Sequence, residues 1–376
     1  MFELTNEQRR CFGLQPVQSH WVRIEPKPSP YHQHTTIAYL DGTAVRKFIQ
    51  TGSHIYTEYE LDEQLSEDLR YILSKTATAK PILLSAATLE KRTPLGMGLS
   101  YTRNNRGYTD IMLFGHVSQR VYYSNAYEPM YTYGKDDFKQ WVAQWCADTA
   151  PDDLAAIAQF AAQPRKHVKF REGDVFRFKI NRRLYGYGRI LVDYGLMRKK
   201  KIPFWDILAG KPLACSVYHI TTERTDVSLA ELEKLDSLPS LHIMDNHLYY
   251  GDYEIIGNIP IGESEDYPIM YGDSISALYR AVHLQCGKLF IRDDNGRALF
   301  PHMKNGLIGF DLRFDLAILQ ACIGAGSNEP YWAQNKWDIN QDLRNPKNRT
   351  MLEQVCGQFG LSPAQLLKRG DVHENF

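Results

Sequence analysis

The chain has 376 residues, of which 43% are hydrophobic, and its 44 basic residues balance its 44 acidic residues to a formal net charge of zero. This composition is typical of a globular protein of about two domains and argues against a strongly basic nucleic-acid-binding protein. With no run of roughly 18 apolar residues, no signal-peptide pattern and six scattered cysteines, we expect a cytoplasmic protein without a membrane or nucleic-acid partner, whose oligomeric state stays open.

The first predicted elements are a hairpin and a helix. Strand-forming residues 35–40 and 43–49 flank Asp41-Gly42, and glycine tolerates the positive φ of a tight turn. Apolar residues then recur at helical spacing and predict a helix over 61–73, namely Leu61, Leu65, Leu69, Ile72 and Leu73. We expect two or three further strands between Ile82 and Tyr123.

Two helices are predicted to close the first domain. The first has an apolar stripe at the spacing i, i+3, i+4 and i+7, formed by Phe138, Trp141, Val142 and Trp145. The second begins at Pro151, because proline suits the first position of a helix. These elements predict an N-terminal α+β domain over residues 1–163, whose role the sequence does not indicate.

A second hairpin is predicted beyond the boundary near Pro164. Apolar and charged residues alternate over 174–180, which predicts a strand with one apolar and one charged face. The return strand over 185–191 contains Gly186 and Gly188, which suit a bulge or a close backbone approach. We predict a β-rich domain over residues 168–325 and a C-terminal helical tail over residues 326–376.

Later signals add helices and strands to this half. Ser228 and Glu231 form a capping-box pattern for a short helix, and Asp273 is predicted to cap a longer helix that reaches Val282. Strands are predicted over 289–291 and 298–300, on either side of a tight turn, and over 310–314. The predicted fold class is therefore α+β, with two domains that are each a mainly antiparallel twisted sheet with a few packed helices.

Six positions of the second hairpin carry a family resemblance: Gly173, Asp174, Phe176, Tyr187, Gly188 and Arg189. A strand that begins Gly-Asp-x-Phe, followed by a turn and Tyr-Gly-x-Gly-Arg or similar, resembles the opening of the immunity protein 26 family. Members of that family often have proline two residues after the phenylalanine, where this chain has Phe178. The resemblance covers residues 173–191, extends more loosely to Cys322, and leaves residues 1–163 outside it.

The candidate partner-binding residues are aromatic and charged. They are Tyr185, Tyr187 and Arg189 of the hairpin, and Asp252, Glu254, Glu263, Glu265 and Asp266 of a later acidic stretch. An arginine inside an apolar strand needs a partner, and Asp174 across the hairpin is a candidate for Arg189. Residues 262–266 are expected to form an exposed loop, which either meets a basic partner or only contacts solvent.

A second interpretation is that some of the polar residues of this half bind a metal ion. His242, Asp245 and His247 place three possible ligands within six positions, although 245–247 is also typical of a polar turn. The sequence contains no phosphate-binding loop, dinucleotide fingerprint or Gly-x-Ser-x-Gly elbow. We therefore predict no catalytic residue and no cofactor.

Two functions follow from the resemblance. It implies an immunity protein that protects bacteria from a cognate polymorphic toxin by binding it without turnover. The description of the family also overlaps a small coroxon-hydrolysing phosphotriesterase, which implies as the alternative a metal- or histidine-dependent hydrolase of phosphotriesters or related esters. Such a hydrolase would use a metal ion to lower the pKa of a bound water.

Overall fold

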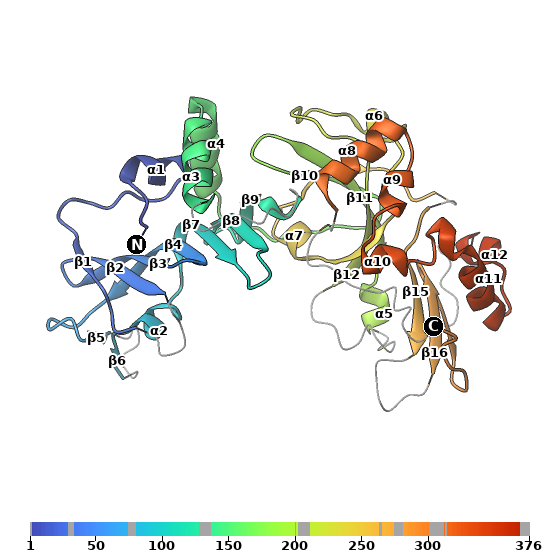
Figure 1. Cartoon of the computed structure of the whole chain (residues 1–376), viewed down its shortest axis with the longest axis horizontal. Helices are drawn as coiled ribbons and strands as arrows, with labels where there is room; N and C mark the ends of the chain where they lie inside the picture. Colours follow the sequence, from blue (N-terminus) through green and yellow to red (C-terminus); the bar gives the residue numbers. More distant parts are fainter. Residues whose placement is uncertain are drawn as a thin grey trace. The chain divides into compact units, whose positions relative to one another are not determined.

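A computed structural model describes residues 2–28, 34–73, 80–127, 137–199, 201, 211–262, 265–273, 281–300, 312 and 314–368. The chain divides into two compact units, Met1–Lys166 and His167–Phe376 (Figure 1). The strand pairs of the described residues are antiparallel, and helices pack on the sheets, so the fold is α+β as predicted.

The first unit is built on a seven-stranded sheet in the order β1-β2-β3-β4-β7-β8-β9. Its strands are β1 (Val22–Ile24), β2 (Thr35–Asp41), β3 (Ala44–Thr51), β4 (Ile55–Gln64), β7 (Leu95–Arg103), β8 (Thr109–Gly115) and β9 (Arg120–Ser124). The predicted hairpin is β2–β3, and Gly42 in its turn has a φ of 59°. The sequence therefore located the turn between β2 and β3 correctly.

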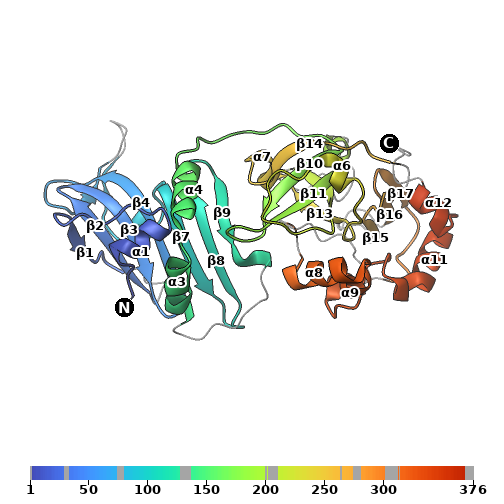
Figure 2. The same cartoon turned by 90° about the horizontal axis from the view of Figure 1, so that it is seen from above.

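Helices cover one face of this sheet. Figure 2 shows α1 (Asn6–Cys11), α3 (Asp137–Ala147) and α4 (Pro151–Ala161) across it, and Phe12, Trp145 and Phe160 pack there with Ile37 and Leu113 of the strands. The opposite face has its own core beneath β5 (Tyr71–Ile72), β6 (Ile82–Leu83) and α2 (Ala86–Leu89), and η1 (Asn125–Tyr127) follows β9. Both predicted closing helices are confirmed.

The helix predicted over 61–73 is wrong. Leu61 belongs to β4, and Leu65 forms a bridge to Ile72 instead of a helical turn. Leu61, Leu65 and Ile72 are buried against Phe48 of the neighbouring strand. Leu61 lies in a strand because β4 is placed between β3 and β7 and its backbone groups join their ladders, whereas Leu69 and Leu73 are exposed.

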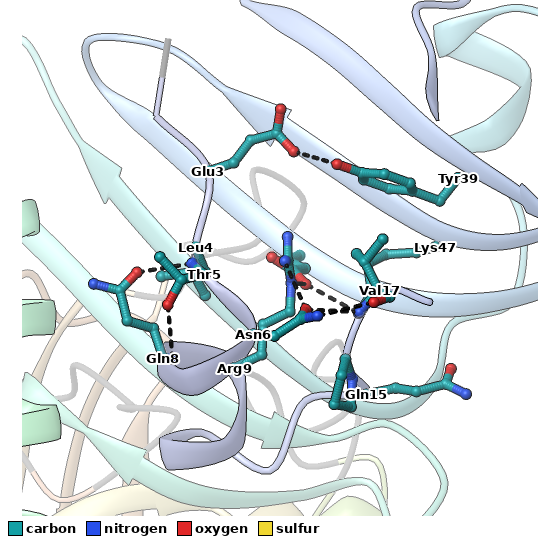
Figure 3. A network of polar contacts seen from close by, with 12 residues as sticks. Glu3, Leu4, Thr5, Asn6, Gln8, Arg9, Gln15, Val17, Tyr39 and Lys47 are labelled. Atoms are coloured by element: carbon teal, nitrogen blue, oxygen red, sulfur yellow. Dashed lines mark hydrogen bonds and ion pairs between the residues drawn. The ribbon is translucent and has the colours of Figure 1, made fainter. Parts of the chain in front are cut away.

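A buried polar network fixes α1 on the sheet (Figure 3). Arg9 donates to a Glu58 carboxylate oxygen at 2.7 Å, and the Lys47 ammonium lies 2.9 Å from the same oxygen. The side chains of Lys47 and Glu58 are fully buried, and 5% of the Arg9 side chain is exposed. Burial alone raises the pKa of Glu58, but Lys47 and Arg9 outweigh it and lower that pKa below its ordinary value.

The second unit contains a five-stranded sheet in the order β13-β12-β11-β10-β14. Its strands are β10 (Asp174–Lys179), β11 (Tyr185–Asp193), β12 (Pro212–Val217), β13 (Leu241–Met244) and β14 (Glu254–Asn258). A Cβ at Gly186 would lie 2.5 Å from the ring of Phe178, and one at Gly188 would lie 2.6 Å from the ring of Phe176. The predicted hairpin is β10–β11, and its glycines are required by this close approach of the rings.

A three-stranded sheet and the C-terminal helices share one core in this unit. The sheet contains β15 (Ile269–Asp273), β16 (Val282–Cys286) and β17 (Leu289–Asp293), and α11 (Arg349–Gln358) and α12 (Pro363–Lys368) pack on it through Val355 and Leu366. The other helices described in this unit are α5 (Gly195–Lys199), α6 (Leu229–Leu232), α7 (Asn246–Tyr249), α8 (Leu316–Ala325), α9 (Glu329–Trp332), α10 (Trp337–Asn340) and η2 (Pro346–Asn348). Residues 326–368 thus contain several short helices separated by loops, and they contribute to the core of the second unit.

Several local predictions for this half are settled by the structure. The capping box at Ser228 is present at the start of α6. Val282 lies in strand β16 rather than in a helix, and residues 274–280 of the predicted helix lie outside the described residues. Strand β17 pairs with β16, so the predicted pairing of 289–291 with 298–300 is wrong. Leu312 and Phe314 are not in a strand, and Phe310 lies outside the described residues.

Two further features concern the cysteines and the hydropathy of the helices. All six cysteines are free thiols, and four of them are buried. In the part of the chain that the structure describes, the helices are too short or too polar to cross a membrane.

Candidate functional site

Strand β11 presents three predicted partner-binding residues on one face, because side chains two positions apart point to the same side of a strand. Tyr187 is fully buried with Val175 and Leu232, and its hydroxyl donates to the carbonyl oxygen of Arg224 at 2.9 Å. Tyr185 is half-buried, and the Arg177 guanidinium lies 5.2 Å from its ring centre. Tyr187 therefore leaves no ring surface for a partner, whereas Arg189 lies beyond this core.

Arg189 is held by a residue that the sequence had placed in an exposed loop. Its guanidinium donates to the carboxylate of Glu265 and, at 3.4 Å, to the carbonyl oxygen of Pro260. Only 13% of the Arg189 side chain and 14% of the Glu265 side chain are exposed. Glu265 is thus a half-buried residue with a structural partner, which corrects the expectation of a solvated loop at this position.

The predicted pairing of Arg189 with Asp174 is wrong. The register of the hairpin places Arg189 opposite Val175, so Asp174 is not its cross-strand neighbour. Asp174 instead accepts hydrogen bonds from Asn258 of β14 at 2.8 Å and from the backbone N–H of Arg171 at 2.9 Å. Asp174 therefore stabilises the start of β10.

A pocket opens beside the Arg189–Glu265 pair. It has a volume of about 400 Å³. Its walls come from β11 and β12, from the segments that follow β12, α6 and β14, and from the segments that precede α9 and β15. The lining residues are Arg189, Ser216, Tyr218, His219, Glu233, Leu235, Asp236, Ser237, Ile259, Glu265, Asp266, Ser327 and Asn328. We call this cavity the Arg189 pocket. It brings together Arg189, Glu265 and Asp266 from the predicted set.

The wall of the Arg189 pocket is braced by a contact between segments that are distant in the sequence. A ring nitrogen of His219 lies 2.9 Å from the side-chain oxygen of Asn328, and the Asn328 amide donates to the carbonyl oxygen of Ser237 at 2.9 Å. Neither residue was identified from the sequence, because no motif links the end of a strand to an asparagine 109 positions later. Only the folded chain brings them together.

Asp266 belongs to a second ion pair at the edge of the pocket. It accepts from Arg344 at 2.8 Å and from the backbone N–H of Ser240 at 2.9 Å, and 45% of its side chain is exposed. Arg344 is mostly buried and also donates to Asp342 at 2.7 Å. Burial alone lowers the pKa of Arg344, but Asp266 and Asp342 outweigh it and raise that pKa, so the guanidinium stays charged.

The hydroxyl of Tyr218 interacts electrostatically with the charged residues Arg189, Glu265 and Glu233 of the pocket. Tyr218 is 5% exposed, and its buried hydroxyl has no hydrogen-bond partner among the residues that the structure describes. Burial raises the pKa of Tyr218; Glu265 and Glu233 raise it further, while Arg189 lowers it. An unsatisfied buried hydroxyl costs free energy until it finds a partner, so the pocket holds a polar group that a ligand can satisfy.

The rest of the predicted acidic stretch does not join the Arg189 pocket. Glu254 is 60% exposed in its side chain and pairs with Arg177 at 2.5 Å across the sheet. Asp252 lies 2.8 Å from a ring nitrogen of His247, and Glu263 lies outside the described residues. The acidic residues therefore split into separate sites, of which one contains Glu265 and Asp266.

The structure does not bring the three candidate metal ligands together. His242 is buried, with a ring nitrogen 3.2 Å from the hydroxyl of Tyr194, and burial followed by the nearby Arg344 lowers its pKa to about 3. Asp245 instead accepts from the backbone N–H of Lys211 at 3.1 Å, and His247 pairs with Asp252. Across the described segments, no group of three or more His, Cys, Asp or Glu side chains is arranged to hold a metal ion.

Comparison with known proteins bears on the half of the chain that contains the pocket. A family model described as Immunity protein 26 matches residues 171–280, which span β10 to β15. No curated protein and no solved structure matches the chain. The match confirms the resemblance predicted from residues 173–191, and it includes Arg189, Tyr218 and Glu265 but not Asn328. Over residues 171–280 the chain thus matches the Immunity protein 26 family, which indicates an immunity protein.

Proposed function

We propose that this chain is a cytoplasmic immunity protein of a bacterial polymorphic toxin system, and that it binds its cognate toxin without turnover. The match of residues 171–280 to Immunity protein 26 is the observation that carries the proposal. The C-terminal unit supplies the contact surface, and the Arg189 pocket lies at its centre. Residues of the N-terminal unit enlarge the scaffold or add contacts to the same toxin.

The chemistry of the pocket supports recognition. Arg189 and Arg344 are each committed to a carboxylate, and the His219 ring is engaged by Asn328. Half-buried charges of this kind suit a protein interface, where arginine and tyrosine residues in desolvated pockets contribute most of the binding free energy. No observation on the described residues favours hydrolysis, since His242, Asp245 and His247 have separate partners.

Co-expression tests this proposal directly. The full chain is expressed with each toxin encoded beside its gene, and we expect one of them to be neutralised and to copurify with the chain. Failure of every neighbouring toxin to be neutralised or bound would contradict the proposal.

A titration separates binding from turnover. Purified toxin is mixed with increasing amounts of the chain, and residual toxin activity and intact mass are measured. Binding without turnover predicts that protection is complete at one chain per toxin molecule and that the toxin mass is unchanged. Protection at a small fraction of that ratio, or a changed toxin mass, would indicate catalysis instead.

A further inference from the structure

The carboxylates of the Arg189 pocket outnumber its cations. Four acidic residues line it, and Arg189 is the arginine among the lining residues. Glu265 pairs with Arg189 and Asp266 pairs with Arg344. The two that remain, Glu233 and Asp236, are exposed and form no ion pair within the described part of the chain. The pocket therefore has two uncompensated negative charges at its rim.

A second observation comes from a residue in the wall of the pocket. The hydroxyl of Tyr218 is buried and unpartnered within the described residues, and it interacts electrostatically with Arg189, Glu265 and Glu233, which all line the pocket. This hydroxyl can accept a hydrogen bond from an ammonium or guanidinium group. The two rim carboxylates and the hydroxyl thus offer acceptors to the same cation.

The apolar residues of the pocket fit the rest of such a side chain. Leu235 and Ile259 line the cavity together with the acidic groups. Lysine and arginine side chains place their methylene stems along apolar surface while the charged end reaches polar groups. A cavity of about 400 Å³ has room for one side chain of this length.

An anion fits the same pocket less well. The Nε–H of Arg189 also lacks an acceptor among the described residues, a feature that by itself favours an anion. However, Glu265 already pairs with this guanidinium, and an entering anion would face the free carboxylates of Glu233 and Asp236. Like charges at short range repel, so the excess of negative charge in the pocket favours a cation over an anion.

We propose that the Arg189 pocket receives a lysine or arginine side chain of the partner protein. Glu233 and Asp236 neutralise its charge, and the Tyr218 hydroxyl accepts a hydrogen bond from it. This inference rests on the proposed function and names the chemistry of the partner, a protein with a protruding basic side chain at its contact surface.

The test uses small probes in place of a toxin. The full chain is labelled with ¹³C at isoleucine methyl groups, because Ile259 lines the pocket and reports on its contents. Nα-acetyl-arginine amide and Nα-acetyl-lysine amide are titrated in, with the uncharged citrulline amide and the acidic glutamate amide as comparisons. We expect at least one basic probe to shift the Ile259 signal saturably, with a dissociation constant in the millimolar range, and the other probes to have no such effect.

Variants assign the binding to the proposed groups. Glu233→Gln with Asp236→Asn is expected to abolish the shift, and Tyr218→Phe to weaken probe binding about tenfold, since hydrogen bonds to charged groups are the stronger kind. The matched control Asp338→Asn with Glu353→Gln removes the same charge from exposed residues on α10 and α11 outside the pocket, and it should bind as the parent does.

The outcomes separate this inference from the proposed function. Equal shifts with the citrulline amide, a shift with the glutamate amide alone, no shift with either basic probe, or a pocket variant that binds normally would each overturn the inference. Such a result would leave toxin neutralisation in co-expressing cells untouched. A saturable shift without neutralisation of any toxin would support the cation site and contradict the proposed function.

Discussion

Each unit contains an arginine–glutamate ion pair that is mostly or fully buried, and the two pairs have different surroundings. In the first unit, Arg9 and Lys47 bind one oxygen of the fully buried Glu58, and the hydroxyl of Tyr56 donates to the other oxygen at 2.5 Å. In the second unit, the Arg189–Glu265 pair borders an open pocket with an unpartnered hydroxyl among the described residues. In the first unit both oxygens of the Glu58 carboxylate have partners, whereas in the second unit the pocket has an unpartnered hydroxyl and two carboxylates without an ion pair among the described residues.

This difference shows how one pair of residue types serves two purposes. A buried carboxylate is stabilised when protein donors and cations replace its lost water, and Glu58 has Arg9, Lys47 and Tyr56 in that role. The network then fixes α1 on the sheet (Figure 3). At the Arg189 pocket, by contrast, some carboxylates lack a counter-charge and one hydroxyl lacks a hydrogen-bond partner within the part of the chain that the structure describes. A bound molecule that supplied both would be stabilised there.

The largest effect is expected from Glu58→Gln. This change leaves Lys47 and Arg9 buried without a counter-charge, and breaking such a buried network costs about 3–5 kcal/mol of unfolding free energy. Urea unfolding, combined with hydrogen exchange read separately in β3–β4 and β10–β12, should show the loss in the first unit only. The control Asp62→Asn on the same strand removes an exposed partner of Arg46 and should cost less than about 1 kcal/mol. A Glu58→Gln loss as small as that of the control would contradict a strong stabilisation by the buried Glu58 carboxylate.

The next largest effect is a decrease in the free energy of unfolding at acidic pH, which we expect from the buried, neutral ring of His242. Burial lowers the pKa of His242 to about 3 in the folded chain, whereas an unfolded histidine has a pKa of about 6.5. The stabilisation by neutral His242 is therefore complete above about pH 6.5 and falls by about 1.4 kcal/mol per pH unit until about pH 3.

Urea unfolding of the second unit between pH 7 and pH 4 measures this slope. His242→Gln should flatten it, and His167→Gln, at an exposed position of the same unit, should leave it unchanged. An unaltered slope in His242→Gln would show that the ring is not the source of the acid sensitivity.

A smaller effect is expected from Glu265→Gln. Both members of its pair keep some exposure, so the cost lies between the limits for buried and surface pairs, at about 1–2 kcal/mol of unfolding free energy. Hydrogen exchange in β10–β12 reports the change. A loss equal to that of Glu58→Gln would mean that the two ion pairs are equally strong, which would remove the distinction between a fully buried carboxylate and one beside an open pocket.

The smallest effect is expected from Glu254→Gln. Its carboxylate pairs with Arg177, but 60% of the glutamate side chain is exposed to water. Surface pairs contribute about 1 kcal/mol or less, and salt screens them. Urea unfolding at low and high salt should therefore differ little between this variant and the parent. A cost above that of Glu265→Gln would place the stronger ion pair at the sheet edge and not at the pocket.

Local patterns in the sequence predicted much of the framework. The alternation over 174–180 and the glycines of 185–191 gave the β10–β11 hairpin, and the capping box at Ser228 gave the start of α6. These features depend on neighbouring residues, because turn geometry, side-chain alternation and helix caps are set within a few positions of the chain. The same hairpin carried the resemblance that the family match confirms.

The partners of the charged residues were decided only by the tertiary structure. Arg189 is 76 positions from Glu265, and His219 is 109 positions from Asn328. Likewise, Leu61 of the helix predicted over 61–73 lies in β4, because β3 and β7 offer a ladder on both sides of that strand. The periodicity of apolar residues indicates which side chains prefer a buried face. Long-range packing determines which strands pair and which charged residues meet, and it therefore forms the Arg189 pocket.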